Sequence, residues 1–167
     1  EIPIHLPDNI EKNVYIWKAS ANKTEKKVLE EGVKTRDKLR ILLVNVESFA
    51  TAKVIKYLEA FTHRSNFMLA VDESTTIKNI KAKRTKSVLK LGDSAKYKRL
   101  LTGSPITQSP MDLYAQCAFL DKDLLGFDSY WSFQGRYAII RQTRMGNHSF
   151  QQVVGFRNLE ELTDKLH

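Results

Sequence analysis

Two adjacent carboxylates, Asp72 and Glu73, end an apolar run in the middle of the chain. The run, residues 67–71, has the length and continuous hydrophobicity of a buried strand. Carboxylate oxygens suit Mg²⁺, which proteins commonly hold together with substrate phosphates. A second acid beside the first can orient an attacking water or take its proton. The pair therefore predicts metal-assisted phosphate chemistry. The alternative is a strand end that simply turns polar where it meets water.

The segment after the acid pair is strongly basic. No acid occurs between Ser74 and Gly92, whereas the same segment contains Lys78, Lys81, Lys83, Arg84, Lys86 and Lys90. The whole chain has a net charge of +8, which favours an anionic partner such as nucleic acid, a nucleotide or a membrane surface. A solvated helix face is the alternative for such a charge run. Its place directly after the acids favours a phosphate-rich partner.

Four apolar runs predict strands, at residues 14–17, 39–46, 67–71 and 97–102. The second and third are almost continuously hydrophobic, which is typical of parallel strands covered on both faces. Helical patterns occupy the intervals between these runs. Strands that alternate with helices predict an α/β fold, a parallel sheet with helices on both faces.

The helices have recognisable boundaries. Residues 22–31 begin with a cap-like Asn22 and Glu25 three residues later, and we expect Gly32 to end the helix. We expect a second helix over residues 49–61 and a third over residues 81–91. Ser109 is expected to cap a fourth helix, with Pro110 at its first position. The buried stripes are predicted to be Val54, Leu58 and Phe61 in the second helix and Leu113, Cys117 and Leu120 in the fourth.

The character of the chain changes after Asp121. Five aromatic residues crowd into residues 127–137, and we expect them to form core rather than a surface that stacks on bases. A hairpin is expected around 146–156. A closing helix at 158–166 would bury Leu159, Leu162 and Leu166. The absence of repeats and of a low-complexity linker predicts one domain over residues 1–167.

Composition excludes several classes of protein. No apolar stretch approaches 18 residues, so the sequence predicts no membrane span. The single cysteine, Cys117, cannot form an internal disulfide and fits a reducing cytosol. The four histidines, His5, His63, His148 and His167, lack metal-ligand spacing.

Two motifs carry a family resemblance. The segment VDESTTIKN, residues 71–79, resembles motif II of superfamily-two helicases, and it is most similar to the Swi/Snf-like branch. The segment LLTGSPITQSPMDLYAQCAFLD, residues 100–121, resembles motif III, with Ser104 where the family usually has Thr. Residues 41–51 resemble the preceding strand and turn, although Val46 replaces an aromatic residue and only Glu47 matches. The resemblance covers residues 39–140, with a weaker match over residues 158–166. Within the family, the sequence is most similar to phage-encoded members.

The resemblance implies a RecA-like motor domain that binds ATP and Mg²⁺. Asp72 would coordinate the magnesium of bound ATP, and Glu73 would polarise the attacking water. Motif II would be residues 72–75 and motif III residues 102–104. Thr102, Gly103 and Ser104 would couple hydrolysis to the grip on nucleic acid, unless they are an ordinary turn. The implied nucleic-acid contacts, expected to be with double-stranded DNA, are Lys78, Asn79, Lys81, Lys83 and Arg84.

A phosphate-cradling loop of the type Gly-x-x-x-x-Gly-Lys-Ser/Thr is missing from the sequence, since none of the seven glycines precedes a lysine. We therefore expect residues 1–167 to be the distal half of a first motor domain, with the P-loop upstream, and to be inactive alone. The expected location is the cytoplasm of a bacterium or a phage-infected cell. The alternatives are a non-catalytic basic nucleic-acid-binding module and a different P-loop machine, such as a restriction-enzyme motor subunit. Oligomeric state stays open.

Overall fold

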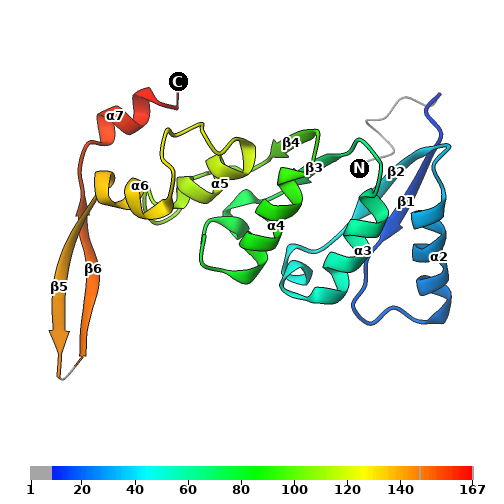
Figure 1. The fold of residues 1–167 in the computed structure, drawn as a ribbon, viewed down its shortest axis with the longest axis horizontal. Helices are drawn as coiled ribbons and strands as arrows, with labels where there is room; N and C mark the ends of the chain where they lie inside the picture. The colour runs from blue at the N-terminus through cyan, green and yellow to red at the C-terminus, as the bar shows by residue number, and fades with distance from the viewer. Residues whose placement is uncertain (1–8, 147, 167) are drawn as a thin grey trace. The chain divides into compact units, whose positions relative to one another are not determined.

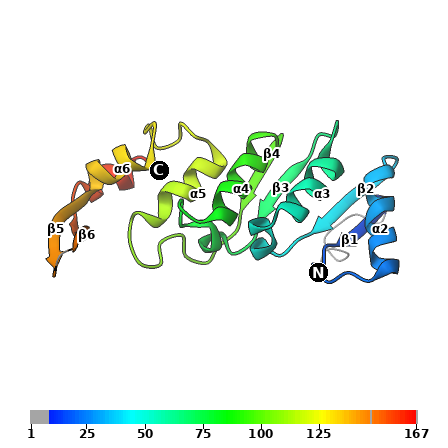
Figure 2. The ribbon, with the colours of Figure 1, turned by 60° about the horizontal axis from the view of Figure 1, so that its bottom comes forward.

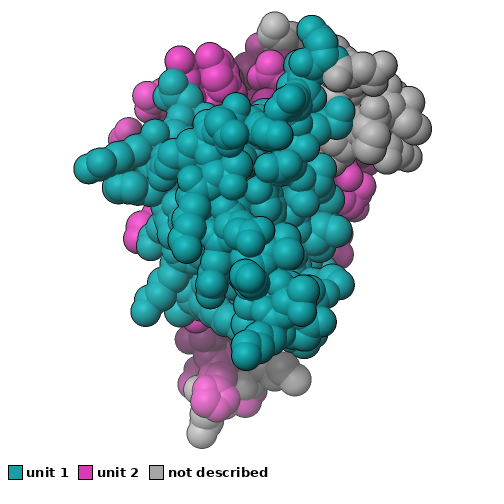
Figure 3. All heavy atoms as spheres, turned by 90° about the vertical axis from the view of Figure 1, so that its right-hand side faces the viewer, with its two compact units in different colours: residues 1–67 teal, residues 68–167 magenta. Residues whose placement is uncertain are grey.

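The computed structural model describes residues 9–146 and 148–166 (Figure 1). The chain forms two compact units, residues 1–67 and 68–167, which Figure 3 distinguishes by colour. Strands and helices alternate through most of the chain, and the first four strands form parallel pairs. The predicted α/β class with parallel strands is confirmed. His5 and His167 lie outside the described residues.

The first unit is built on one parallel strand pair. β1 (Lys12–Ile16) pairs with β2 (Leu39–Leu43) from Lys12 opposite Leu39 to Ile16 opposite Leu43. The helices of the unit are α2 (Lys23–Lys34), the 3₁₀ helix η1 (Val46–Ala50) and α3 (Ala52–Thr62). Its buried side chains include Tyr15, Trp17, Leu29, Phe49, Val54, Leu58 and Phe61. The stripe predicted for the second helix is thus confirmed.

Asn22 caps α2 as predicted, but Gly32 does not end the helix. The Asn22 side chain accepts the Glu25 N–H at 2.9 Å, and the Glu25 carboxylate accepts the Asn22 N–H at 2.9 Å. The prediction for Gly32 is wrong because α2 continues to Lys34. A Cβ atom at position 32 would lie 2.9 Å from two ring carbons of Tyr15. Glycine at this position therefore allows α2 to approach β1 closely.

We expect Gly32→Ala to lower the free energy of unfolding by about 1–3 kcal/mol, because the added methyl group would overpack the Tyr15 ring. The better helix propensity of alanine offsets this by only about 0.5–1 kcal/mol. Gly135→Ala is the matched control, since a Cβ at that helical position would meet nothing within 4 Å apart from its chain neighbours and the backbone of its own helix. Chemical denaturation of both variants measures the difference, and equal effects would contradict the packing argument.

The second unit begins with another parallel pair. β3 (Met68–Val71) runs beside β4 (Tyr97–Leu100). The 3₁₀ helix η2 (Ser74–Ile77) and helix α4 (Lys83–Asp93) connect the two strands. In β1, β3 and β4 exposed side chains alternate with more buried ones, with Ile16 at 56% and Met68 at 59% exposed. The apolar sequence of these strands is therefore buried on one face within the described residues.

The rest of the second unit packs around α5 (Asp112–Leu120) and α6 (Tyr130–Tyr137). Its core contains Met111, Leu113, Cys117, Leu125, Phe133, Tyr137, Ala138 and Leu162. Phe127, Phe133 and Tyr137 pack against one another, with ring centroids 4.9–5.5 Å apart. The aromatic core is confirmed for Phe133 and Tyr137, but the prediction is wrong for Trp131, which is 60% exposed.

The leucine stripes are only partly as predicted. Leu113 and Cys117 are buried, and burial raises the pKa of the Cys117 thiol to about 11, which fits a packing role. Leu120 is exposed, because the buried face of α5 turns toward Ala115, Gln116 and Phe119 instead. In α7 (Leu159–Asp164) only Leu162 is buried. Leu159 and, just beyond the helix, Leu166 are exposed, so the predictions for both are wrong.

A long antiparallel hairpin precedes α7. β5 (Ala138–Met145) pairs with β6 (His148–Phe156). The hairpin expected around 146–156 is thus confirmed, although its first strand begins earlier than predicted. No helix of the described residues is long and apolar enough to cross a membrane.

Candidate functional site

The acid pair lies at the carboxyl end of β3, beside the segment that follows β4. The Leu101 N–H donates to the Val71 carbonyl at 3.0 Å, and the Ser74 N–H donates to the Leu101 carbonyl at 3.0 Å. Strand pairing therefore continues past Val71 and Leu100. The structure brings Asp72 and Glu73 to the same edge as Thr102–Ser104. Both carboxylates are exposed there.

Glu73 has an unusual backbone conformation for its residue type. Its φ of 52° and ψ of 61° lie in the left-handed region. Such conformations at non-glycine residues cost about 1–3 kcal/mol and cluster at functional sites. The Glu73 N–H donates to Asp72 Oδ1 at 2.9 Å. The chain therefore turns sharply at the acid pair, and this hydrogen bond orients the Asp72 carboxylate.

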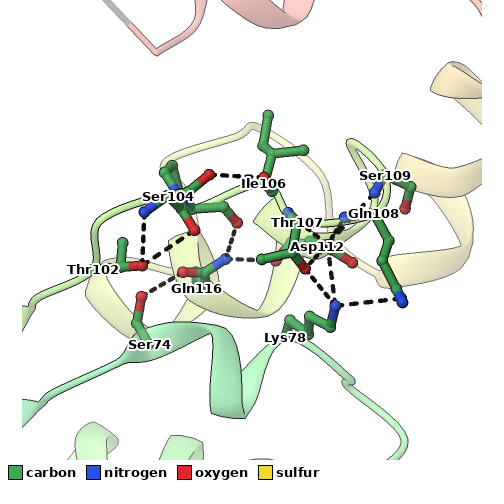
Figure 4. A network of polar contacts seen from close by, with 11 residues as sticks. Ser74, Lys78, Thr102, Ser104, Ile106, Thr107, Gln108, Ser109, Asp112 and Gln116 are labelled. Atoms are coloured by element: carbon green, nitrogen blue, oxygen red, sulfur yellow. Dashed lines mark hydrogen bonds and ion pairs between the residues drawn. The ribbon is translucent and has the colours of Figure 1, made fainter.

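Gln116 joins the two predicted motifs. The buried Ser74 hydroxyl donates to Gln116 Oε1, and Gln116 Nε2 donates to the Pro105 carbonyl at 2.7 Å (Figure 4). The same amide nitrogen donates to the Asp112 carbonyl at 2.9 Å. Sequence reasoning missed Gln116. The available signal was a glutamine between Leu113 and Cys117, on the buried part of a helix.

The hydroxyl groups of the Thr102–Ser104 turn form hydrogen bonds within the turn and to the residues directly after it. Thr102 Oγ1 accepts the Ser104 N–H at 3.2 Å and donates to the Ser104 carbonyl at 3.1 Å. Ser104 Oγ donates to the Ile106 carbonyl at 2.9 Å. Gly103 is exposed between them. The turn is therefore held in one shape beside the acids, and its coupling role stays a prediction.

Asp112 organises the start of α5. Its Oδ2 accepts the N–H groups of Thr107 and Gln108 at 3.1 and 2.9 Å, and the Thr107 hydroxyl at 2.9 Å. The prediction that Ser109 caps this helix is wrong, because the helix begins at Asp112 and the residue at its cap position, Met111, makes no side-chain cap. The Asp112 carboxylate instead satisfies the amides of the preceding turn.

Lys78 belongs to the same polar network. Its ammonium group lies 3.4 Å from Asp112 Oδ2 and donates to Thr107 Oγ1 and, at 3.3 Å, to Gln108 Oε1 (Figure 4). The Lys78 side chain is only 26% exposed. Lys78, which directly follows η2, thus links that 3₁₀ helix to the segment before α5. Its contact with nucleic acid stays a prediction.

We expect Asp112 to make stability depend on acid pH. Burial raises the pKa of this carboxyl, but hydrogen bonds from the Gln108 N–H, the Thr107 hydroxyl and the Thr107 N–H outweigh burial and lower it below the ordinary 3.8. A carboxyl with a lowered folded-state pKa contributes stability above its unfolded pKa and loses it as the pH falls through the folded pKa.

Asp112→Asn should therefore flatten the loss of stability below about pH 3.8. Urea unfolding at a series of pH values measures this slope. Asp37→Asn, which removes an exposed carboxylate, is the control. An unchanged slope in Asp112→Asn would contradict the assignment.

The other predicted nucleic-acid contacts have different surroundings. The Asn79 side chain accepts the Lys81 N–H at 2.9 Å, and the Lys81 ammonium lies 4.7 Å from the centroid of the Trp131 ring. Lys83 is exposed at the start of α4. Arg84 Nε donates to the Thr76 carbonyl at 3.0 Å. Asn79, Lys81 and Lys83 are thus the exposed members of the set.

The acid pair fits a magnesium ion that is held largely by other ligands. Among the described residues, no group of three or more His, Cys, Asp or Glu side chains is placed to hold a metal ion. Mg²⁺ usually takes one or two carboxylates together with water and substrate phosphates. Two exposed carboxylates at a strand end suit that mode of binding.

Comparison with known proteins places the chain in a family. The family model described as SNF2-related domain matches residues 1–163, so the chain belongs to this family. The resemblance to the Swi/Snf-like branch is thereby confirmed, whereas the similarity to phage-encoded members stays a prediction.

Several relatives carry the name SWI/SNF-related matrix-associated actin-dependent regulator of chromatin subfamily A-like protein 1. The protein from Xenopus laevis is 32% identical over 148 residues, which is 87% of this chain and 14% of that protein. The protein from Drosophila melanogaster is 38% identical over 96 residues, which is 58% of this chain and 12% of that protein. The chain thus spans a small part of these relatives.

A solved structure is also similar. It is the Sulfolobus solfataricus SWI2/SNF2 ATPase core in complex with dsDNA, with a TM-score of 0.49 and 25% sequence identity. The similarity covers 78% of this chain and 29% of that chain.

Proposed function

We propose that this chain is part of an ATP-dependent DNA helicase or translocase, in which hydrolysis of Mg-ATP drives movement on double-stranded DNA. The observation that carries the proposal is the meeting of the Asp72–Glu73 strand end with the Thr102–Ser104 turn. Membership of the SNF2-related family supports it. In α/β sheets, ligands bind outside the carboxyl ends of the strands, which is where both segments lie.

The two carboxylates have separate proposed roles. Asp72, which is oriented by the Glu73 N–H, would hold the magnesium ion that accompanies the nucleotide phosphates. Glu73 would orient the attacking water and accept its proton. ATP and Mg²⁺ supply the reactive phosphate and the charge that stabilises it.

Coupling to DNA is proposed to run through the polar network around Gln116. Neighbouring strand ends lie about 5 Å apart, so the Thr102–Ser104 turn can respond to a change of charge at Glu73. Ser74, Gln116 and the Pro105 carbonyl then link the acid segment to the turn. Asn79, Lys81 and Lys83 would meet phosphates with a sequence-independent affinity that falls with salt.

The chain is proposed to supply the distal half of a motor domain. No glycine in the sequence is followed by lysine, so the phosphate-cradling loop that such a motor requires would lie in a segment outside these residues. Two carboxylates alone should bind Mg-ATP poorly. We therefore expect residues 1–167 by themselves to show no ATP hydrolysis.

Phosphate release by the complete protein, with and without duplex DNA, tests the proposed function. We expect hydrolysis of ATP that is stimulated by duplex DNA. Salt-sensitive DNA binding without any hydrolysis would contradict the motor and would favour the non-catalytic nucleic-acid-binding module.

A further inference from the structure

The β5–β6 hairpin projects from the second unit. Figures 1 and 2 show its two strands running side by side away from α6. Its base is anchored, since Ala138 is buried and Phe156 packs against the core of the unit. The Arg157 N–H donates to the Tyr137 carbonyl at 2.9 Å, and the Arg157 guanidinium donates to the carbonyls of Gly135 and Arg136. The hairpin is therefore fixed at one end.

Beyond its base the hairpin is exposed, and it carries basic side chains as well as exposed Phe150, Val153 and Val154. No acid occurs from Ser129 to Leu159, and this stretch contains four arginines. Arg141 and Arg144 lie on the exposed part of β5. Glutamines at positions 142, 151 and 152 add exposed groups that both donate and accept hydrogen bonds. Positive charge without acids, combined with amide groups, matches the chemistry of nucleic acid.

The strand register distributes these groups over both faces. Arg141 is opposite Gln152, Gln142 is opposite Gln151, and Arg144 is opposite Ser149. Because successive residues of a strand point to opposite faces, Arg144 shares one face with Gln142 and Gln151. Arg141 lies on the other face, where Thr143 Oγ1 donates to Gln152 Oε1 at 3.3 Å. Each face therefore presents one arginine and at least one glutamine.

We propose that this hairpin is a second DNA-binding element, which enters the major groove of duplex DNA. The groove is about 12 Å wide and about 8.5 Å deep, and it admits a two-stranded β-ribbon. Two phosphate backbones flank it, so arginines on opposite faces of a ribbon can each meet one backbone. The glutamine amides come within reach of base edges. The hairpin is separate from residues 78–84, which contain the DNA contacts predicted from the sequence. The hairpin proposal depends on the proposed function only in taking duplex DNA as the partner.

Neutralising both arginines tests the hairpin directly. Duplex binding by the chain is measured by fluorescence anisotropy at several salt concentrations. Arg141→Gln combined with Arg144→Gln should weaken binding and flatten the slope of log K against log salt by about 2, because each phosphate contact contributes about 0.9. Lys26→Gln combined with Lys27→Gln is the matched control, since both lysines are exposed on α2 and the change in charge is equal.

Equal slopes for the two double variants would overturn the proposal, as would a wild-type chain that does not bind duplex DNA at low salt. Neither result depends on ATP hydrolysis, so failure of the hairpin and failure of the motor are distinguishable. Circular dichroism and thermal melting check that the hairpin variant is folded. Its changed side chains are exposed, so we expect no loss of stability.

Cross-linking supplies a second test. Ser149 is exposed on β6, and the single native cysteine, Cys117, is buried, so a photo-crosslinker reacts selectively with a Ser149→Cys variant. We expect cross-links from position 149 to duplex DNA and far fewer from a Ser20→Cys control, which is also exposed. Cross-links from position 149 to a second copy of the chain, with none to DNA, would assign the hairpin to self-association and overturn the proposal.

Discussion

Replacing Glu73 by glutamine is expected to reduce DNA-stimulated ATP hydrolysis by the complete protein at least about 100-fold, because a positioned general base contributes about 10²–10⁴-fold to rate. Glutamine has nearly the same shape as glutamate but cannot take a proton from water. The variant should still bind duplex DNA, since Glu73 lies outside the basic residues that are proposed to meet phosphates. Single-turnover phosphate release measures the effect.

Two further variants test whether the loss of turnover is specific to the acid pair. Glu30→Gln removes an exposed carboxylate from α2 and should leave turnover unchanged. Asp72→Asn should also strongly reduce turnover, and it should raise the magnesium concentration needed for nucleotide binding. Turnover that persists in Glu73→Gln would show that another group activates the water.

The second large effect is expected at Gln116. Gln116→Leu would leave the Ser74 hydroxyl and the Pro105 carbonyl without their hydrogen-bond partner. An unsatisfied buried polar group costs about 1–3 kcal/mol. Because the Ser74 hydroxyl is buried, we therefore expect a loss of about 1–3 kcal/mol in the free energy of unfolding. In the complete protein, the same variant should lose stimulation of ATP hydrolysis by DNA, because the link between the two motifs is cut.

A double-mutant cycle with Ser74→Ala tests whether the pair acts together. Because the two side chains bond directly, their effects on the free energy of unfolding should be non-additive by about 0.5–3 kcal/mol. Urea unfolding of the two single variants and the double variant gives the coupling energy. Strict additivity would contradict the proposed link.

Local spacing predicted much of the fold. The Asn22–Glu25 cap and the Val54, Leu58 and Phe61 stripe depend on residues three or four positions apart, which a helix fixes by itself. The role of Gly32 could not be predicted from such local spacing. A glycine either ends a helix or allows close packing, and the deciding contact is with Tyr15, on a different element. Trp131 likewise shares an aromatic tract with Phe133 but faces outward.

The sequence predicted the order of the site's segments along the chain, but it did not predict the hydrogen bonds that connect them. The apolar run before Asp72 predicted a strand end, and Thr102 was expected at the end of the next strand, although β4 already ends at Leu100. The contact between Ser74 and Gln116 joins residues 42 positions apart, so no local pattern reveals it. The charge of Lys78 predicted an anionic partner, and the partner in the structure is Asp112. Charge alone does not distinguish an internal carboxylate from an external phosphate.

The position of the nucleotide is the most direct test of the central claim. A crystal structure of the complete protein with the Glu73→Gln substitution, bound to Mg-ATP and duplex DNA, measures it. We expect the magnesium ion to lie at the end of β3, with the Asp72 carboxylate bound to it directly or through a water, and the terminal phosphate to face the Thr102–Ser104 turn. A magnesium-bound nucleotide located away from this strand end would show that Asp72 and Glu73 do not form the nucleotide site.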